Sequence, residues 1–94
     1  MSTIFENPQI KEQRKLAVAG QRLYEIILFN DDVNTFDWVI ESLMEICEHS
    51  PEQAEQCSLI VHYKGQCAVK TGTYDELEPQ CTALLERGLS AEIS

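Results

Sequence analysis

The distribution of apolar and polar positions after about residue 21 predicts six short elements. Apolar and β-branched residues dominate residues 22–29, as is typical of a strand that is covered on at least one side. Asn34, with Asp37 three residues later, is the expected N-cap of a helix that follows. Apolar residues recur along this helix at helical spacing and are expected to face the core: Phe36, Val39, Ile40, Leu43, Met44 and Cys47.

A second helix has clear start and stop signals. Ser50 is a preferred N-cap residue, and Pro51 suits the first helical position because it needs no backbone N–H donor there. The helix is expected to run to about Tyr63 and to end at Gly65.

The remaining chain predicts two strands around a third helix. Residues 66–71 alternate outward and inward side chains, as in a half-buried strand, and residues 89–93 alternate in the same way. Between them, Thr73 and Glu76 form a capping box, and Gly88 is the expected C′ residue. The order β-α-α-β-α-β predicts an α+β domain of two layers, in which a three-stranded antiparallel sheet packs against three helices.

The first 20 residues differ from the rest. They are polar and mixed in charge, contain Pro8 and lack a sustained apolar period, so they are expected to form a flexible N-terminal extension. Residues 21–94 then form one folded core, because 94 residues suffice for one small domain and a single site.

Charge is divided unevenly along the chain. Residues 1–22 carry a balance of +2 and the remainder carries −11, which gives the net charge of −9. A body this acidic repels phosphate backbones and anionic membranes, so we expect no nucleic-acid or membrane function. A basic segment on an acidic body indicates a protein partner instead.

Neither a membrane span nor a secretory signal is visible, so a cytoplasmic protein is expected. In that compartment the cysteines are expected to be small buried hydrophobes, namely Cys47, Cys57, Cys67 and Cys81. A zinc site with His49 and His62 as further ligands is disfavoured, because no C-x-x-C motif occurs and the cysteines fall in four different predicted elements. We therefore expect no metal and no other cofactor.

Catalytic motifs are also missing from the sequence. It contains no G-x-S-x-G, no H-E-x-x-H and no glycine-rich phosphate loop. Cys57 and His62 lie five residues apart on one predicted helix, which separates them by about 140° around its axis. We therefore expect no enzyme and no catalytic residue, although a thiol- or metal-dependent enzyme remains an alternative if these side chains converge.

Asn30, Asp31 and Asp32 lie where the first strand gives way to the first helix. Together with the imidazole of His62, their oxygens can surround a primary ammonium, which has three N–H donors and no acceptor. The alternative is a plain turn, since Asn and Asp also bond their own backbone. Five apolar residues are candidates either for the walls of an adjacent cavity or for plain core: Leu28, Phe36, Val39, Val61 and Leu89.

These residues carry a resemblance to a known family. The segment from Arg22 to the C-terminus resembles the ClpS family, the adaptors that deliver N-degron substrates to bacterial AAA+ Clp unfoldases. The resemblance rests on Leu-x-Asn-Asp-Asp over residues 28–32, on the helix that follows, and on Val-His-Tyr-Lys-Gly over residues 61–65. These motifs occur in the family's order and without a gap between Asn30 and His62.

The resemblance implies a function and a set of site residues. It implies that Asn30, Asp32 and His62 hold the α-amino group of a substrate's first residue, with Asp31 in support. It implies that a bulky first side chain, usually Leu, Phe, Tyr or Trp, enters a pocket lined by Leu28, Asn34, Phe36, Val39, Ser58, Val61 and Leu89. The implied partners are N-degron proteins and peptides and a AAA+ Clp unfoldase of the ClpA or ClpC type, with the adaptor itself a monomer.

Three pocket positions depart from the family pattern. Phe36 and Ser58 stand where the family commonly has Met, and Asn34 stands where it commonly has Thr, so the preference for the first side chain is expected to shift. The runner-up function is a non-catalytic protein-interaction domain of similar two-layer fold, like the C-terminal domain of the ribosomal stalk protein. Such a domain would need no N-degron pocket.

Overall fold

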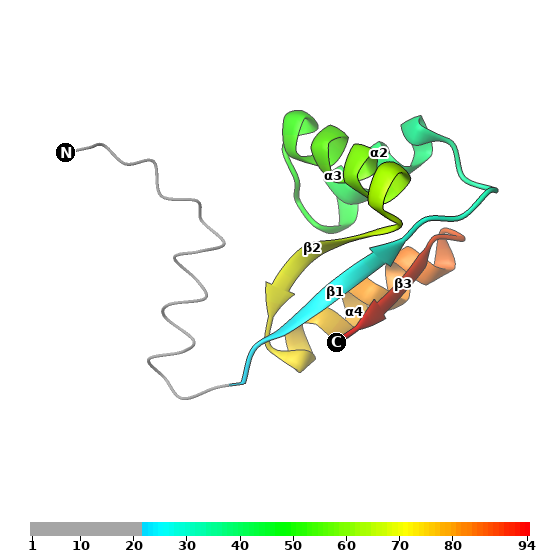
Figure 1. Cartoon of the computed structure of the whole chain (residues 1–94). Coiled ribbons are helices and arrows are strands. Elements are labelled where there is room, and N and C mark those ends of the chain that lie inside the picture. The colour runs from blue at the N-terminus through cyan, green and yellow to red at the C-terminus, as the bar shows by residue number, and fades with distance from the viewer. Residues whose placement is uncertain (1–21) are drawn as a thin grey trace.

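The computed structural model describes residues 22–94 and contains the six expected elements in the expected order. Figure 1 shows them along the chain. They are β1 (Tyr24–Phe29), α2 (Phe36–Ile46), α3 (Pro51–Lys64), β2 (Gln66–Gly72), α4 (Tyr74–Glu86) and β3 (Ser90–Ile93). The predicted flexible extension, residues 1–20, lies outside the described residues.

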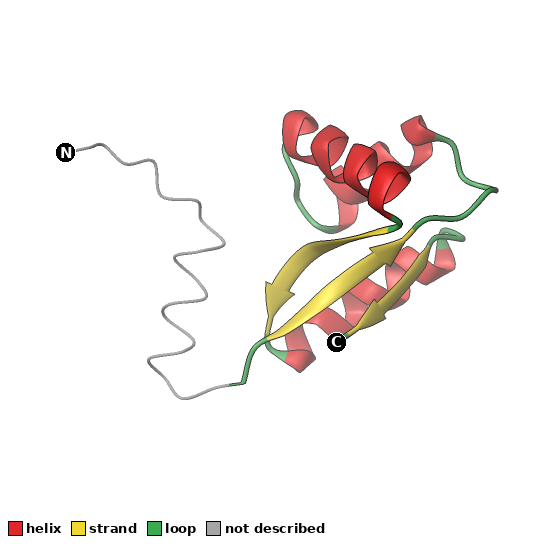
Figure 2. Cartoon of the chain, in the orientation of Figure 1, coloured by secondary structure: helices red, strands yellow, loops and turns green. Residues whose placement is uncertain are grey.

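The three strands form one antiparallel sheet in the order β2-β1-β3 (Figure 2). The central strand β1 pairs along its whole length with β2, from Tyr24 opposite Gly72 to Phe29 opposite Gln66. Its second half also pairs with β3, where Phe29 lies opposite Ser90. The predicted α+β class and the three-stranded antiparallel sheet are therefore confirmed.

The helices are divided between two places on this sheet. Helix α4 contacts all three strands, whereas α2 and α3 pair with each other near the end of the sheet at which β1 stops and β2 starts (Figure 1). Ile26 and Leu28 point to the same side of β1 and are almost fully buried, as period-2 alternation requires. The buried apolar core comprises Ile26, Leu28, Leu43, Cys47, Ala54, Cys57, Val61, Val69, Leu77, Cys81, Leu84 and Leu89.

Most of the predicted helix boundaries are confirmed, and each has a local cause. The Ser50 hydroxyl accepts the backbone N–H of Gln53 at the start of α3, and Thr73 and Glu76 make the complete capping box of α4. Gly65 has a φ of 91° as it ends α3, a conformation that side chains with a Cβ rarely adopt.

The predicted start of α2 is wrong by one residue. Thr35, not Asn34, is the N-cap, and its hydroxyl accepts the backbone N–H of Trp38 at 3.1 Å. The side chain of Asn34 is engaged elsewhere, as described below. The predicted core stripe of this helix also needs correction, because Phe36 is 41% exposed and Met44 is 36% exposed. Only Leu43 and Cys47 of that stripe are buried.

Arg87 joins α2 to α4. Its guanidinium lies 5.2 Å from the centroid of the Trp38 ring, pairs with Glu45 and donates a hydrogen bond to the buried hydroxyl of Ser42. In return, Nε1 of Trp38 donates to the backbone carbonyl of Arg87 at 3.0 Å. These contacts, which run from the first to the last turn of α2, hold this helix against the C-terminal end of α4.

The cysteines are mostly buried, as expected from the sequence. Three are buried and Cys67 is partly exposed, and all four are free thiols. Burial raises the pKa of Cys47 to about 11 and that of Cys57 to about 12, so both thiols are protonated at neutral pH and are poor nucleophiles. Within residues 22–94 no three His, Cys, Asp or Glu side chains gather in a way that could hold a metal ion. No helix in this part of the chain is long and apolar enough to cross a bilayer.

His49 is a buried histidine between α2 and α3. Its Nε2 lies 2.6 Å from the carbonyl oxygen of Val69, so Nε2 carries the proton and donates it to β2. Nδ1 is buried without a hydrogen-bond partner among the described residues. Burial lowers the pKa of His49, and the positive charge of Lys70 acts in the same direction, although the bond to Val69 opposes them. The native fold therefore holds this imidazole in its neutral form.

We predict that the free energy of unfolding falls as the pH is lowered from about 7 to about 5. The pKa of His49 is lower in the folded than in the unfolded chain, so the unfolded chain binds the proton first as the pH passes the ordinary imidazole value of 6.5. His49→Gln keeps a donor for Val69 but cannot titrate, and urea denaturation should show a weaker pH dependence. The control is Val33→Ala, which shortens an 86% exposed side chain that does not titrate and should keep the pH dependence of the parent. An unchanged pH dependence in His49→Gln would contradict the prediction.

Candidate functional site

The candidate site is built where the central strand ends. Phe29, the last residue of β1, lies between Gln66 on one side and Ser90 on the other. The next residue, Asn30, donates its backbone N–H to the carbonyl of Gly65 at 2.9 Å. Because Gly65 directly follows α3, this pairing brings Asn30 beside the last turn of α3, which carries His62.

Asp31 organises the turn that follows. One of its carboxylate oxygens, Oδ1, accepts the backbone N–H groups of Val33 and Asn34, each at 2.9 Å, and Oδ2 accepts the Asn34 amide at 2.8 Å. Burial disfavours the charged carboxylate, but the bonds from Asn34 and Val33 outweigh it and lower the pKa of Asp31. Asp31 is therefore ionised at neutral pH. Its carboxylate bonds to the backbone of its own turn, so for this residue the alternative of a plain turn is correct.

Asn34 fastens this turn to the opposite side of the site. Its Nδ2 donates one hydrogen bond to Asp31 and a second, at 2.9 Å, to the carbonyl oxygen of Gly88. Gly88 lies between α4 and β3 and has a φ of 86°. The amide thus connects the loop after β1 to the loop before β3, which explains why Asn34 does not cap α2.

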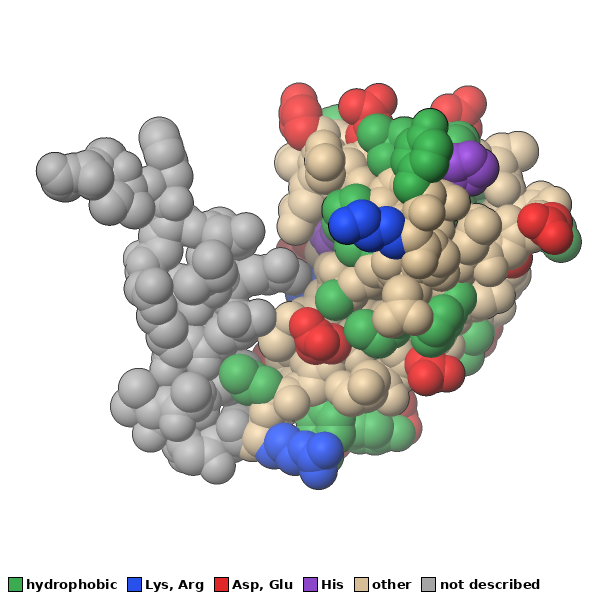
Figure 3. All heavy atoms as spheres, in the orientation of Figure 1, with side chains coloured by type: hydrophobic (Ala, Val, Ile, Leu, Met, Phe, Trp, Pro, Cys, Tyr) green, Lys and Arg blue, Asp and Glu red, His purple; other side chains and the backbone are tan. Residues whose placement is uncertain are grey.

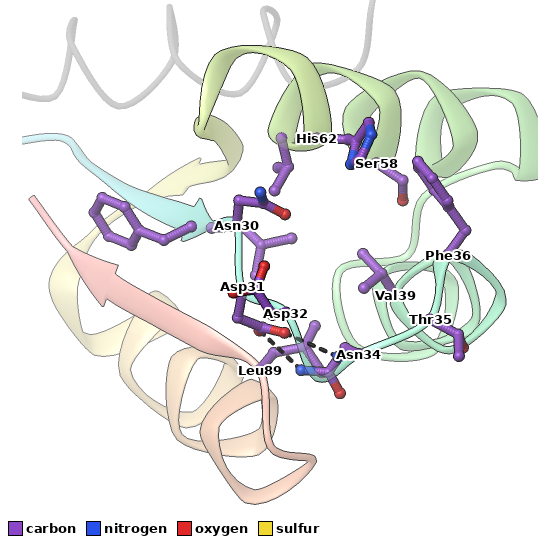
Figure 4. A pocket seen from close by; sticks show the side chains of 13 residues that line it. Asn30, Asp31, Asp32, Asn34, Thr35, Phe36, Val39, Ser58, His62 and Leu89 are labelled. Atoms are coloured by element: carbon purple, nitrogen blue, oxygen red, sulfur yellow. Dashed lines mark hydrogen bonds between the residues drawn. The ribbon is translucent and has the colours of Figure 1, made fainter.

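Asn30 and Asp32 differ from Asp31 in their surroundings. Both are exposed, and their side chains make no hydrogen bond to other described residues. Figure 4 shows the loop that carries them facing His62 across the mouth of a cavity. The acceptors of Asn30 and Asp32 are therefore free for a ligand, whereas those of Asp31 maintain the loop.

These residues surround a cavity of about 320 Å³. All eleven residues proposed from the sequence for amine or side-chain binding lie in its lining, together with two that the sequence did not indicate, Phe29 and Thr35. The full lining is Leu28, Phe29, Asn30, Asp31, Asp32, Asn34, Thr35, Phe36, Val39, Ser58, Val61, His62 and Leu89. The sequence predicts Phe29 only as a strand residue, and the one signal that Thr35 carries is its suitability as an N-cap, which does not indicate a cavity.

The cavity has an apolar interior and a polar mouth. Leu28, Val61 and Leu89 are each at least 95% buried and form apolar walls contributed by β1, α3 and the residue just before β3. Phe36 lies at the rim, with its ring centroid 5.2 Å from that of His62. The lining therefore suits an apolar side chain that is attached to a small cation, because carboxylate and amide oxygens surround the entrance.

The alternative of a thiol-dependent enzyme finds no geometric basis in residues 22–94. Cys57 is buried in the core, whereas His62 is exposed at the mouth of the cavity. The cavity lining contains no cysteine. The pair discussed from the sequence is therefore not brought together.

Fold and cavity together define a small two-layer α+β binding domain, in which a loop of hydrogen-bond acceptors borders an apolar pocket. The model of the family described as ATP-dependent Clp protease adaptor protein ClpS matches residues 19–92. The chain therefore belongs to the ClpS family.

Several relatives are similar over most of the chain. A ClpS adapter protein of Campylobacter jejuni is 43% identical over 65 residues, which cover 67% of this chain and 66% of the relative. The Edwardsiella ictaluri protein of the same description is 36% identical over 80 residues, which cover 85% of this chain and 74% of that relative. The matched segment thus spans just under two thirds of the length of the Campylobacter relative.

A solved structure shows the same fold. Agrobacterium tumefaciens ClpS2, bound to L-phenylalaninamide, has a TM-score of 0.72 and 23% sequence identity to this chain. The match covers 78% of this chain and 95% of the Agrobacterium chain. The β-α-α-β-α-β arrangement is therefore the fold of this ClpS structure.

We predict that Asn34→Ala lowers the free energy of unfolding by about 1–2 kcal/mol. The change removes both amide bonds and leaves the Gly88 carbonyl and one Asp31 oxygen without their protein donor. Urea denaturation measures the loss. The control is Val33→Ala in the same loop, where an 86% exposed side chain is shortened with an expected effect within about 0.5 kcal/mol. Equal stability of the two variants would contradict this role of the amide.

Proposed function

We propose that this protein is an adaptor that binds the free N-terminal bulky hydrophobic residue of N-degron substrates and delivers them to a AAA+ Clp unfoldase. In this proposal Asn30, Asp32 and His62 accept the N–H donors of the substrate α-ammonium, and Asp31 supports the loop. The first side chain of the substrate enters the cavity, against Leu28, Asn34, Phe36, Val39, Ser58, Val61 and Leu89.

One observation carries the proposal: a single cavity has free acceptors at its mouth and apolar walls inside. An N-terminal amino acid has the matching form, with an ammonium and a side chain on the same carbon atom. The ligand of Agrobacterium ClpS2, L-phenylalaninamide, combines these two groups, which supports the assignment.

The expected strength of binding follows from the same contacts. Burial of a Leu- or Phe-sized side chain contributes about 1.5–3 kcal/mol, and each hydrogen bond to a charged group adds roughly 1.5–3 kcal/mol. After the costs of association and ordering, a micromolar complex, about −8 kcal/mol, is reasonable. An adaptor must release its cargo, so such moderate affinity suits the function.

We further propose a ClpA- or ClpC-type unfoldase as partner of a monomeric adaptor in the cytoplasm. Membership in the family of Clp protease adaptors supports the partner class. Residues 23–94 contain 14 acidic and 3 basic residues, and Figure 3 shows acidic side chains spread over the visible face, which disfavours nucleic acids and anionic membranes. The proposed division is a core from residue 21 and an N-terminal extension over residues 1–20 whose basic side chains engage the unfoldase.

The runner-up, an interaction domain without an N-degron pocket, explains less of the site. It gives no reason for a cavity bordered by two free acceptor side chains and a histidine. A function without a pocket would also leave Asn30 and Asp32 without a role.

We predict that a peptide beginning with Phe or Leu binds and that acetylation of its N-terminus removes most of the affinity. Acetylation replaces the ammonium by a neutral amide with one N–H, so the acceptors of Asn30, Asp32 and His62 lose most of their donors. Fluorescence anisotropy with labelled peptides provides the dissociation constants, Kd. Equal Kd values for the free and acetylated peptides would contradict the proposed function.

We predict that Phe36→Ala relaxes discrimination against first residues that branch at Cβ. The flat, stiff ring of Phe36 at the rim should clash with Val and Ile, whose Cβ carries two heavy atoms. The ratio of Kd for Val to Kd for Leu should therefore fall by roughly tenfold, or about 1.4 kcal/mol. Leu59→Ala, which removes an apolar side chain of similar exposure (39%) outside the cavity lining, is the matched control. The same ratio of the Val and Leu Kd values in the parent, in Phe36→Ala and in Leu59→Ala would exclude Phe36 as a determinant of specificity.

A further inference from the structure

Ser58 is the one buried polar side chain in the cavity lining. It is 3% exposed and lies on α3 one turn before His62. Figure 4 shows its side chain extending from α3 into the space opposite Val39 and Asn34. A serine here leaves room that a longer side chain would fill, and it also places an oxygen atom beside the apolar walls of the cavity.

The hydrogen-bonding state of this oxygen is determined by the helix. The Ser58 hydroxyl donates its hydrogen to the carbonyl of Ala54, one turn earlier, at 2.8 Å. A hydroxyl has one donor and two acceptor lone pairs, so the oxygen of Ser58 is left as an acceptor. It therefore cannot donate to a ligand without breaking the bond to Ala54.

Asn34, the other uncharged polar side chain that we place against the substrate side chain, is restricted in the same way. Both hydrogens of the Asn34 amide nitrogen are used, by Asp31 and by Gly88, which leaves only the amide oxygen free. Ser58 and Asn34 thus present oxygen acceptors and no free donor. A ligand side chain that carries a donor matches this lining, whereas one that carries only an acceptor does not.

We infer that Ser58 makes the cavity selective for first residues whose aromatic side chain carries a hydrogen-bond donor, that is, Tyr and Trp over Phe. This inference rests on the proposed function and adds the chemistry of the preferred side chain. The oxygen of Ser58 accepts the phenolic O–H or the indole N–H, and the same atom gives no such bond to a purely hydrocarbon ring.

The test compares peptides that differ only in the donor. One pair begins with Trp or with 3-benzothienylalanine, in which sulfur replaces the indole N–H, and a second pair begins with Tyr or Phe. In the parent protein we expect the donor-bearing member of at least one pair to bind roughly three- to tenfold more tightly. Ser58→Ala removes the acceptor and should bring that ratio close to one, with little change in the Kd for Phe.

The control variant is Ser42→Ala, which removes another fully buried serine hydroxyl that lies outside the cavity lining. It should keep the ratios of the parent, so any general effect of losing a buried hydroxyl is visible separately. Ratios near one in the parent, or ratios that persist in Ser58→Ala, overturn the inference. Failure of all four peptides to bind the parent would instead overturn the proposed function, so the two failures are distinguishable.

Discussion

The backbone hydrogen bond from Asn30 to Gly65 is the contact on which the geometry of the site depends. It extends the pairing of β1 with β2 by one residue beyond the strand, to the point where α3 ends. As a consequence, the first acceptor of the loop lies beside the helical turn that carries His62. On the other edge of β1, pairing of Phe29 with Ser90 brings Leu89 to the same place. Three segments distant in sequence thus meet because a short central strand stops between two neighbours.

The polar residues of the loop divide two tasks between them. Asp31 and Asn34 satisfy the backbone and each other, so they hold the loop in one conformation. Asn30 and Asp32 remain exposed, and their side chains make no hydrogen bond to other described residues. Under the proposed function, an ordered loop limits the entropy that is lost on binding, so the internal bonds of Asp31 and Asn34 favour binding without contact to the substrate ammonium. Folding and recognition therefore depend on adjacent residues of the same run.

Local signals predicted much of this fold from the sequence, because each acts over three or four residues. The caps at Ser50 and Thr73 and the glycine at position 65 needed no tertiary information. Asn34 was misassigned because Asn and Thr are both good N-caps, and the choice between them was decided by Gly88, a partner 54 residues away. Phe36 fits the helical period of the core but lies at the rim, since a cavity rather than another element faces it. Periodicity identifies the inward face of a helix and cannot tell packed core from pocket wall.

The electrostatics of the entrance follow from the same arrangement. The N-terminus of α2 points toward the loop, and its partial positive charge would by itself repel a substrate ammonium. Groups of the protein offset part of this charge: Trp38, in the first turn of α2, donates its backbone N–H to Thr35, and the carboxylate of Asp31 lies in the loop before the helix, where it accepts the N–H groups of Val33 and Asn34. Asp37 adds a negative charge in the first turn of the helix. Under the proposed function, these groups weaken the repulsion at the helix end, so that the charge of Asp32 and the dipoles of Asn30 and His62 act on the substrate ammonium.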